Sequence, residues 1–231
     1  MGNSFKILNV NIIAMKGIKI IMLDFDGTLG DTTGVIIRTT QATIKELGLP
    51  SRTDEQCAAM IGLRLVEIPP VLFPECDIDV NLYAHIYRKN FNIFNTKGAV
   101  SLYSNVPETL SELKNRGLIL TIASSRSRSS LTEYINNLNL AEYISYIIGG
   151  DDVSEGKPNP EAVNRTLEKY GFRPEEAIMV GDTVFDIQMG INAGTHTCGV
   201  TYGNGTAESM ADATWLIDDF SKLLQIVSEQ L

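Results

Sequence analysis

Short apolar segments recur along the chain, and their order constrains the fold more than any other feature. They cover residues 18–23, 118–123, 143–148, 177–180, 197–200 and, more weakly, 214–217. Runs of this length that are apolar nearly throughout are typical of strands covered on both faces. Helical patterns lie between most of them, and two begin near Pro107 and Pro160 and end near Gly117 and Gly171, as is usual for helices. This alternation predicts a parallel α/β sheet with right-handed crossovers.

One segment, residues 34–99, interrupts the alternation. Helical patterns fill it, at 35–47, 54–61, 65–72 and 81–95, and no strand pattern is found there. We therefore expect a helical cap domain at 34–99, inserted into a core domain made of residues 15–33 and 100–231. Residues 1–14 precede the first strand pattern and are interpreted as an N-terminal extension with little structure of its own.

Charge and cysteine content narrow the functional classes. The chain has 19 Lys and Arg against 28 Asp and Glu, a net charge of −9, and no run of basic residues. This composition disfavours nucleic acid and anionic membranes as partners. Three widely spaced cysteines without a CxxC pair, and no signal peptide pattern, indicate a reducing, cytoplasmic location. The oligomeric state, monomer or homodimer, stays open.

Two carboxylates directly follow the first predicted strand. Asp24 and Asp26 lie in the segment Asp-Phe-Asp-Gly-Thr-Leu. In an open parallel sheet the ligand crevice lies outside the carboxyl ends of the strands, so both acids would face it. Two acids this close are costly to hold together unless a cation joins them, which favours a divalent metal ion. A turn in which Gly27 supplies backbone freedom is the alternative for an isolated pair of this kind.

Other candidate site residues also follow predicted strands or precede a helix. Ser124 and Ser125 follow the strand 118–123, Lys157 lies in Gly-Lys-Pro-Asn-Pro, and Asp182 follows the strand 177–180 with Asp186 four residues on. Hydroxyl groups can donate to phosphoryl oxygens, a cation keeps a neighbouring acid ionised, and carboxylate oxygens suit Mg²⁺. The alternatives are a turn residue for Ser124, a solvated Lys157, and a helix N-terminal acid for Asp186.

Together these motifs resemble those of the haloacid dehalogenase superfamily, in its phosphoglycolate phosphatase-like subfamily with a helical cap. The resemblance covers nearly the whole chain from Lys16 onward. It implies an α/β fold, with a Rossmann-like parallel-sheet core and an inserted α-helical cap. It also implies Mg²⁺ as the cofactor, held by Asp24, Asp182, Asp186 and the main-chain carbonyl of Asp26.

The resemblance further implies catalytic roles. Asp24 would be the nucleophile that forms an aspartyl-phosphate, and Asp26 would protonate the leaving oxygen and then activate water. Ser124 and Lys157 would stabilise the phosphoryl group. An Asp at position 26 is the family's pattern for phosphoryl transfer, and the Gly-Asp form at 181–182 favours hydrolysis over mutase action.

The expected activity is therefore Mg²⁺-dependent hydrolysis of a small phosphorylated metabolite, such as phosphoglycolate or a sugar phosphate. Three alternatives stay open: an inorganic pyrophosphatase, a β-phosphoglucomutase-like phosphoryl transferase, and a catalytically idle protein that senses a phosphorylated ligand. The sequence does not identify the substrate.

Substrate contacts are predicted for Thr28, Ser125 and Arg64. Arg64 comes shortly after a glycine in the cap, and in similar proteins the residues after such a glycine face the active site. The alternative is that Arg64 is an arginine on the surface. Arg126 and Arg128 are interpreted as exposed surface charges outside the site.

Overall fold

The computed structural model describes residues 17–230, with side chains through residue 229. The predicted extension at 1–14 lies outside the described residues. The core is a six-stranded sheet in the order β5-β4-β1-β6-β7-β8, and every neighbouring pair is parallel. This confirms the predicted sheet. Its strands are β1 (Ile20–Leu23), β4 (Ile119–Ala123), β5 (Tyr146–Ile148), β6 (Ala177–Gly181), β7 (His196–Val200) and β8 (Trp215–Ile217).

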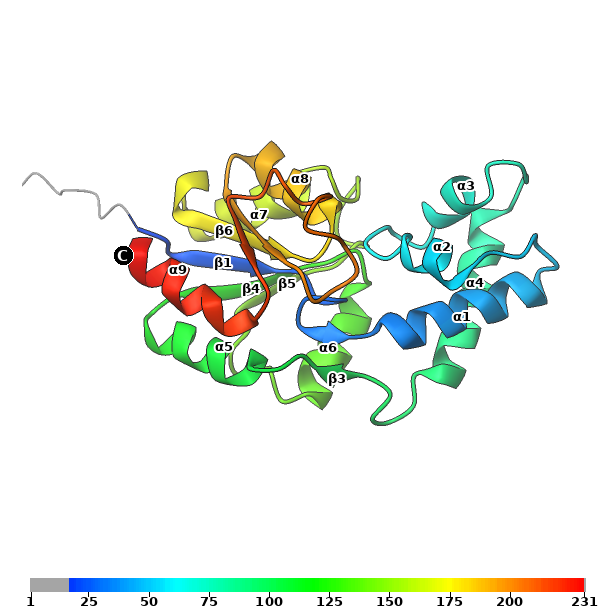
Figure 1. Cartoon of the computed structure of the whole chain (residues 1–231), viewed down its shortest axis with the longest axis horizontal. Helices are drawn as coiled ribbons and strands as arrows, with labels where there is room; N and C mark the ends of the chain where they lie inside the picture. The colour runs from blue at the N-terminus through cyan, green and yellow to red at the C-terminus, as the bar shows by residue number, and fades with distance from the viewer. Residues whose placement is uncertain (1–16, 231) are drawn as a thin grey trace, which may run out of the picture.

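Two layers of helices cover the sheet, one on each face (Figure 1), and the side chains of β1 alternate between these two faces. Ile20 and Met22 belong to the apolar cluster on one face, and Ile21 and Leu23 belong to the cluster on the other. The first face is covered by α7 (Glu161–Tyr170) and α8 (Val184–Ala193), and the second by α5 (Val106–Asn115), α6 (Arg128–Asn137) and α9 (Leu223–Gln230). All four β1 side chains are fully buried, which explains why this strand is apolar throughout.

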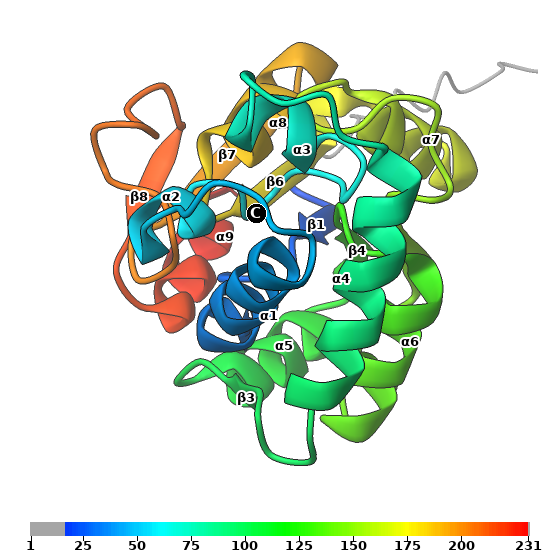
Figure 2. The same ribbon diagram turned by 90° about the vertical axis from the view of Figure 1, so that its right-hand side faces the viewer.

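The segment predicted as the cap forms a helical layer beyond the carboxyl ends of the strands (Figures 1 and 2). Its helices are α1 (Thr33–Glu46), α2 (Asp54–Ala58), α3 (Ile68–Leu72) and α4 (Val80–Phe94). Two short antiparallel strands, β2 (Gly30–Asp31) and β3 (Ser101–Leu102), join its two ends. We keep the name cap for residues 34–99, whose boundaries stay a prediction.

Differences from the predicted elements are small and have local causes. The helix α2 ends at Ala58 and α3 begins at Ile68, because turns occupy most of the positions between them. The β2–β3 pair was not predicted, since two-residue strands leave no periodicity in a sequence. Among residues 17–230, the structure has no helix that is both long and apolar enough to span a membrane.

Candidate functional site

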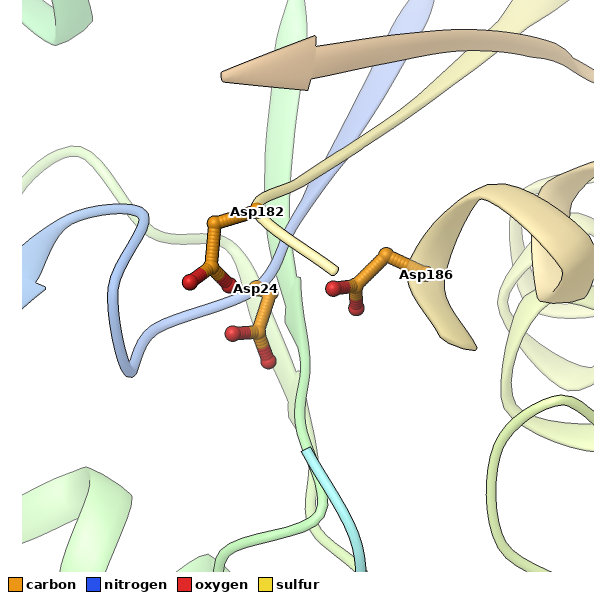
Figure 3. A group of neighbouring side chains, drawn as sticks. All are labelled: Asp24, Asp182 and Asp186. Atoms are coloured by element: carbon orange, nitrogen blue, oxygen red, sulfur yellow. The ribbon is translucent and has the colours of Figure 1, made fainter. Parts of the chain in front are cut away.

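Three carboxylates meet at the carboxyl end of the central strands. Asp24 follows β1, Asp182 follows β6, and Asp186 lies in the first turn of α8. One oxygen of each lies within 4.8 Å of the others, and the three side chains converge in Figure 3. All three are buried, with at most 4% of each residue exposed. Three buried acids at this separation require compensating positive charge.

Lys157 supplies part of that charge. Its Nζ donates to Oδ1 of Asp24 at 2.6 Å and to Oδ1 of Asp186 at 2.5 Å. Burial alone would lower the pKa of the ammonium group, but the two carboxylates outweigh burial and raise it. The lysine is therefore cationic. Its burial excludes the alternative of a solvated surface lysine.

Asp182 has one carboxylate oxygen with protein partners and one without. Its Oδ2 accepts hydrogen bonds from the backbone N–H of Asn204 at 2.7 Å and from the side-chain amide of Asn204 at 2.8 Å. Its Oδ1 is buried and has no hydrogen-bond partner among the residues that the structure describes. Burial, reinforced by Asp186 and Asp24, raises the pKa of Asp182 to about 8. Burial also raises the pKa of Asp24 to about 7, although Lys157 opposes it.

These features fit a hard divalent cation. The unpartnered oxygen of Asp182 lies in the same cluster as the Asp24 and Asp186 carboxylates, and Mg²⁺ takes one or two carboxylates from a protein together with waters. The backbone of Gly27 and Gly203 packs closely against Asp182, because a Cβ atom on either glycine would clash with this side chain. The carboxylate donor set is therefore suited to Mg²⁺.

Asp26 has a different partner. Its carboxylate accepts from Nε of Arg126 at 3.0 Å and from Nη2 of Arg126 at 2.6 Å. The guanidinium lies 5.0 Å from the ring centres of Phe91 in α4 and Tyr134 in α6. Because its oxygens are held by Arg126, the carboxylate of Asp26 is not part of the acid cluster. A role for Asp26 at the metal would rest on its main-chain carbonyl and stays a prediction.

The interpretation of Arg126 as an exposed surface charge is wrong. Only 11% of its side chain is exposed, because the aromatic rings and Asp26 enclose it. Asp26 more than offsets the effect of burial and raises the pKa of the guanidinium. Arg128 is different: 43% of its side chain is exposed, and it pairs with Asp152.

A cleft of about 790 Å³ lies between the cap and the sheet. Its core side carries the acids and hydroxyls that follow β1 and β4, and its cap side carries residues of α4 and of the segment after α2. The lining residues include Asp24, Asp26, Ser124, Ser125 and Arg126 from the core, and Gly62, Leu63, Arg64, Tyr87 and Phe91 from the cap. Asp182, Asp186 and Lys157 lie buried behind this surface.

The two serines after β4 differ in their contacts. Ser124 is buried at the strand end, and its Oγ accepts from the backbone N–H of Arg126 at 3.5 Å. Ser125 donates from Oγ to the carbonyl of Gly62 at 2.5 Å. Ser125 therefore joins the core to the cap at the edge of the cleft.

Arg64 also lines the cleft, but its guanidinium already has partners. Its Nε donates to Oε1 of Glu67 at 2.7 Å, and its Nη1 donates to the carbonyl of Ser154 at 3.1 Å. The alternative of a freely solvated arginine does not describe it, since it bridges the cap and a core loop. Thr28 is fully buried and is not among the cleft-lining residues. Its position therefore does not support the predicted contact with substrate.

Two residues of the site were missed at the sequence level. Arg126 was assigned to the surface, and Asn204, which binds Asp182, was not considered. A signal existed for each: Arg126 is three residues past the end of β4, and Asn204 lies between Gly203 and Gly205 in a loop after β7.

Known proteins with similar sequences support this architecture. Residues 21–200 match the family described as haloacid dehalogenase-like hydrolase. A phosphoglycolate phosphatase of Vibrio parahaemolyticus is 31% identical over 225 residues, which cover 94% of this chain and 99% of the relative. A pyrophosphatase of Bacillus velezensis is 31% identical over 214 residues, covering 91% and 97%. The crystal structure of a haloacid dehalogenase-like hydrolase from Bacteroides fragilis superposes with a TM-score of 0.84 at 27% identity, covering 89% and 99%.

Proposed function

The chain belongs to the haloacid dehalogenase-like hydrolases and is a phosphoric monoester hydrolase, and on this premise we propose that it hydrolyses a small phosphomonoester through an aspartyl-phosphate on Asp24 with Mg²⁺ as cofactor. The family and the class of reaction agree with the prediction from the sequence. The substrate, the covalent intermediate and the metal are the proposal.

One observation carries it: the Asp24 carboxylate lies both in the cleft and in the buried charge cluster. Lys157 holds Oδ1 of Asp24, so attack on phosphorus would use Oδ2. The Lys157 cation opposes the rise in the pKa of Asp24 that burial causes, and so favours the ionised form of the nucleophile. A buried acid that faces a cleft and is held by a buried lysine is suited to nucleophilic catalysis.

Mg²⁺ would be held by Asp24, Asp182 and Asp186. The unpartnered Oδ1 of Asp182 supports this assignment. When bound, the ion supplies positive charge to the oxygens of the transferring phosphoryl group. Lys157 contributes in the same sense from the protein, because it lies on Asp24 and Asp186.

The protein's own groups then divide the reaction into two steps. Asp24 forms a bond to phosphorus while the bond to the leaving oxygen breaks, and Asp26, which enters this step in its protonated form, gives its proton to that oxygen. Water next attacks phosphorus and gives its proton to Asp26, while the bond to Asp24 breaks and inorganic phosphate leaves. Such covalent and general acid–base catalysis replaces one difficult step by two easier ones. The Ser124 hydroxyl, at the strand end beside Asp24, would donate to a phosphoryl oxygen.

Phosphoglycolate is the first candidate substrate, because a relative named phosphoglycolate phosphatase matches over nearly the whole of both chains. Sugar phosphates remain in the same class. Pyrophosphate is a second candidate, since a relative named pyrophosphatase is equally similar. Ser125 and Arg64 are proposed substrate contacts because both lie where the cap meets the core. A cytoplasmic location and a monomeric or homodimeric state complete the proposal.

Phosphate release from a panel of compounds tests the function. The panel contains phosphoglycolate, hexose phosphates and pyrophosphate, each with Mg²⁺ and with EDTA. We expect one phosphomonoester to be strongly preferred and its turnover to stop in EDTA. Release from pyrophosphate alone would replace the phosphomonoester by the second candidate. No release from any compound would contradict the proposal and favour the mutase or the sensor.

A further inference from the structure

We propose that Arg126 is a positioning residue that fixes the orientation of the Asp26 carboxylate, and that the cap completes its binding site through Phe91. The inference rests on the proposed function, in which Asp26 gives a proton to the leaving oxygen. It adds a residue to the reaction that touches neither the phosphoryl group nor the metal.

The contacts of Arg126 restrain the plane of the Asp26 carboxylate. Nε donates to Oδ2 at 3.0 Å, and Nη2 donates to Oδ1 at 2.6 Å. Nη1 donates to Oγ of Ser130 at 3.2 Å, so all three guanidinium nitrogens are engaged. A planar guanidinium group that donates to both oxygens fixes the orientation of a carboxylate, whereas a single ammonium group does not. Each oxygen of Asp26 has a second lone-pair site beside the one that Arg126 occupies, so one of them can carry the proton that passes to the leaving oxygen.

The sheet brings the two residues together. β1 and β4 are parallel neighbours, with Leu23 opposite Ile122. Asp26 and Arg126 both follow these paired strand ends, and both line the cleft. Their ion pair therefore lies on the wall of the cleft, beside Asp24 and not behind it.

The guanidinium is itself held between the core and the cap. Phe91 comes from cap helix α4 and Tyr134 from core helix α6, and each ring centre is 5.0 Å from the guanidinium carbon. The hydroxyl of Tyr134 donates to Oδ1 of Asn95, just after α4, at 2.5 Å. One wall of the Arg126 site thus belongs to the cap. The orientation of Asp26 then depends on the cap being seated on the core.

Two substrates of similar size separate this role from a general loss of structure. p-Nitrophenyl phosphate releases an anion that is stable without a proton, whereas benzyl phosphate releases an alkoxide that must be protonated. We compare kcat/KM on both, because it reports the reaction up to formation of the phosphoenzyme. General acid catalysis contributes about 10²–10⁴-fold. We therefore expect Arg126→Gln to lower kcat/KM on the order of 100-fold with benzyl phosphate and less than about tenfold with p-nitrophenyl phosphate.

Further variants serve as matched controls. Arg126→Lys keeps the charge without the planar guanidinium group, and we expect an intermediate loss with the same dependence on the substrate. Phe91→Leu should give a smaller loss of the same kind. Arg128→Lys changes the neighbouring arginine, which pairs with Asp152 outside the cleft, and should change neither value. Equal losses with the two substrates in both Arg126 variants would overturn the inference, since they would indicate a structural role alone.

A double variant tests whether Arg126 acts through Asp26. In an Asp26→Asn background, Arg126→Gln should cause little further loss with benzyl phosphate, because the group it orients is already inactive. Independent, multiplicative losses would overturn the inference. The single variant Asp26→Asn distinguishes a failure of the proposed function from a failure of the inference about Arg126. If its loss of kcat/KM does not depend on the leaving group, the proposed role of Asp26 as the general acid fails. If Asp26→Asn shows the dependence and the Arg126 variants do not, only the role of Arg126 fails.

Discussion

Nζ of Lys157 lies 2.6 Å from Oδ1 of Asp24, across 133 positions of the sequence. Both side chains are buried, at 4% and 5% exposure. Removing two charges from water is unfavourable unless the geometry is good and further hydrogen bonds are made, and here Asp186 provides the second acceptor. The chain maintains this pair where the cleft meets the acid cluster, which is where we place phosphoryl transfer.

Lys157→Met should destabilise the protein and abolish activity. The change leaves Asp24 and Asp186 buried without their shared cation, and breaking a buried ion pair costs about 3–5 kcal/mol. We expect the free energy of unfolding in urea to fall by about that amount. Lys45→Met, at an exposed position of α1, should change it by less than about 0.5 kcal/mol. Equal stability of the two variants would contradict the buried charge pair.

Asp182→Asn should separate stability from metal binding. The substitution removes one charge from a cluster in which burial and two other acids oppose ionisation, so we expect a higher melting temperature without metal. The rise in melting temperature on adding Mg²⁺ should then need at least tenfold more of the ion, since even outer-shell partners of a metal contribute about 10–100-fold to affinity. The exposed Asp212→Asn is the control. An unchanged Mg²⁺ response in Asp182→Asn would remove Asp182 from the metal site.

The convergence of Asp24 and Asp182 could be predicted because each directly follows an apolar strand. Parallel strands end at one edge of a sheet, so the carboxylates had to meet once the strands were identified. Lys157 could be predicted only through the family resemblance, since nothing in its own segment indicates that a loop before α7 folds back over β1. The alternation of strands and helices was enough for the core of the fold.

The remaining parts of the site depend on contacts between distant segments. Arg126 lies in a Ser-Arg-Ser-Arg stretch, typical of a surface, and it is buried only because Phe91 and Tyr134 enclose it. Asn204 binds Asp182 because the loop after β7 returns to the end of β6. Thr28 lies in the turn after Asp26, yet that turn directs its side chain into the interior. No periodicity within these segments reports such packing.

Gly62→Ala should lower kcat/KM by more than the strain of a positive φ angle alone would. Gly62 has φ +104°, and a Cβ there would lie 3.1 Å from Phe185 and 3.2 Å from the hydroxyl of Thr183. Either these core side chains or the cap segment must give by a few tenths of an ångström. We expect the cap segment to shift, and a penalty of about 1.4 kcal/mol in the transition state lowers kcat/KM tenfold.

The matched control for this variant is Gly98→Ala. Gly98 also has positive φ, at +83°, but in the described part of the chain a Cβ there would meet no atom within 4 Å. Both variants should lose about 1 kcal/mol of stability, measured by urea unfolding, while only Gly62→Ala loses activity. Equal kcat/KM in the two variants would show that the seating of this cap segment does not matter for turnover.

Lys19→Met should lower stability in a way that depends on pH. Lys19 donates to Oε1 of Glu176 at 2.7 Å, and this bond, with the backbone N–H of Arg173, lowers the pKa of Glu176 from 4.5 to about 2. A carboxyl group with a lowered pKa stabilises the fold above its unfolded pKa, and the effect is lost as the pH falls through the folded pKa. The difference in melting temperature between the two proteins should therefore be present at pH 7 and shrink from pH 4.5 towards pH 2. A difference that stays constant over this range would contradict the ion pair.

Rapid-quench mass spectrometry tests the aspartyl-phosphate most directly. The protein is mixed with its preferred substrate and Mg²⁺, quenched in acid during turnover, and digested. We predict that the peptide containing Asp24 carries one phosphoryl group transiently, and that the modification is absent from Asp24→Asn and from samples in EDTA. A phosphoryl group on another residue, or wild-type turnover by Asp24→Asn, would contradict the assignment of Asp24 as the nucleophile.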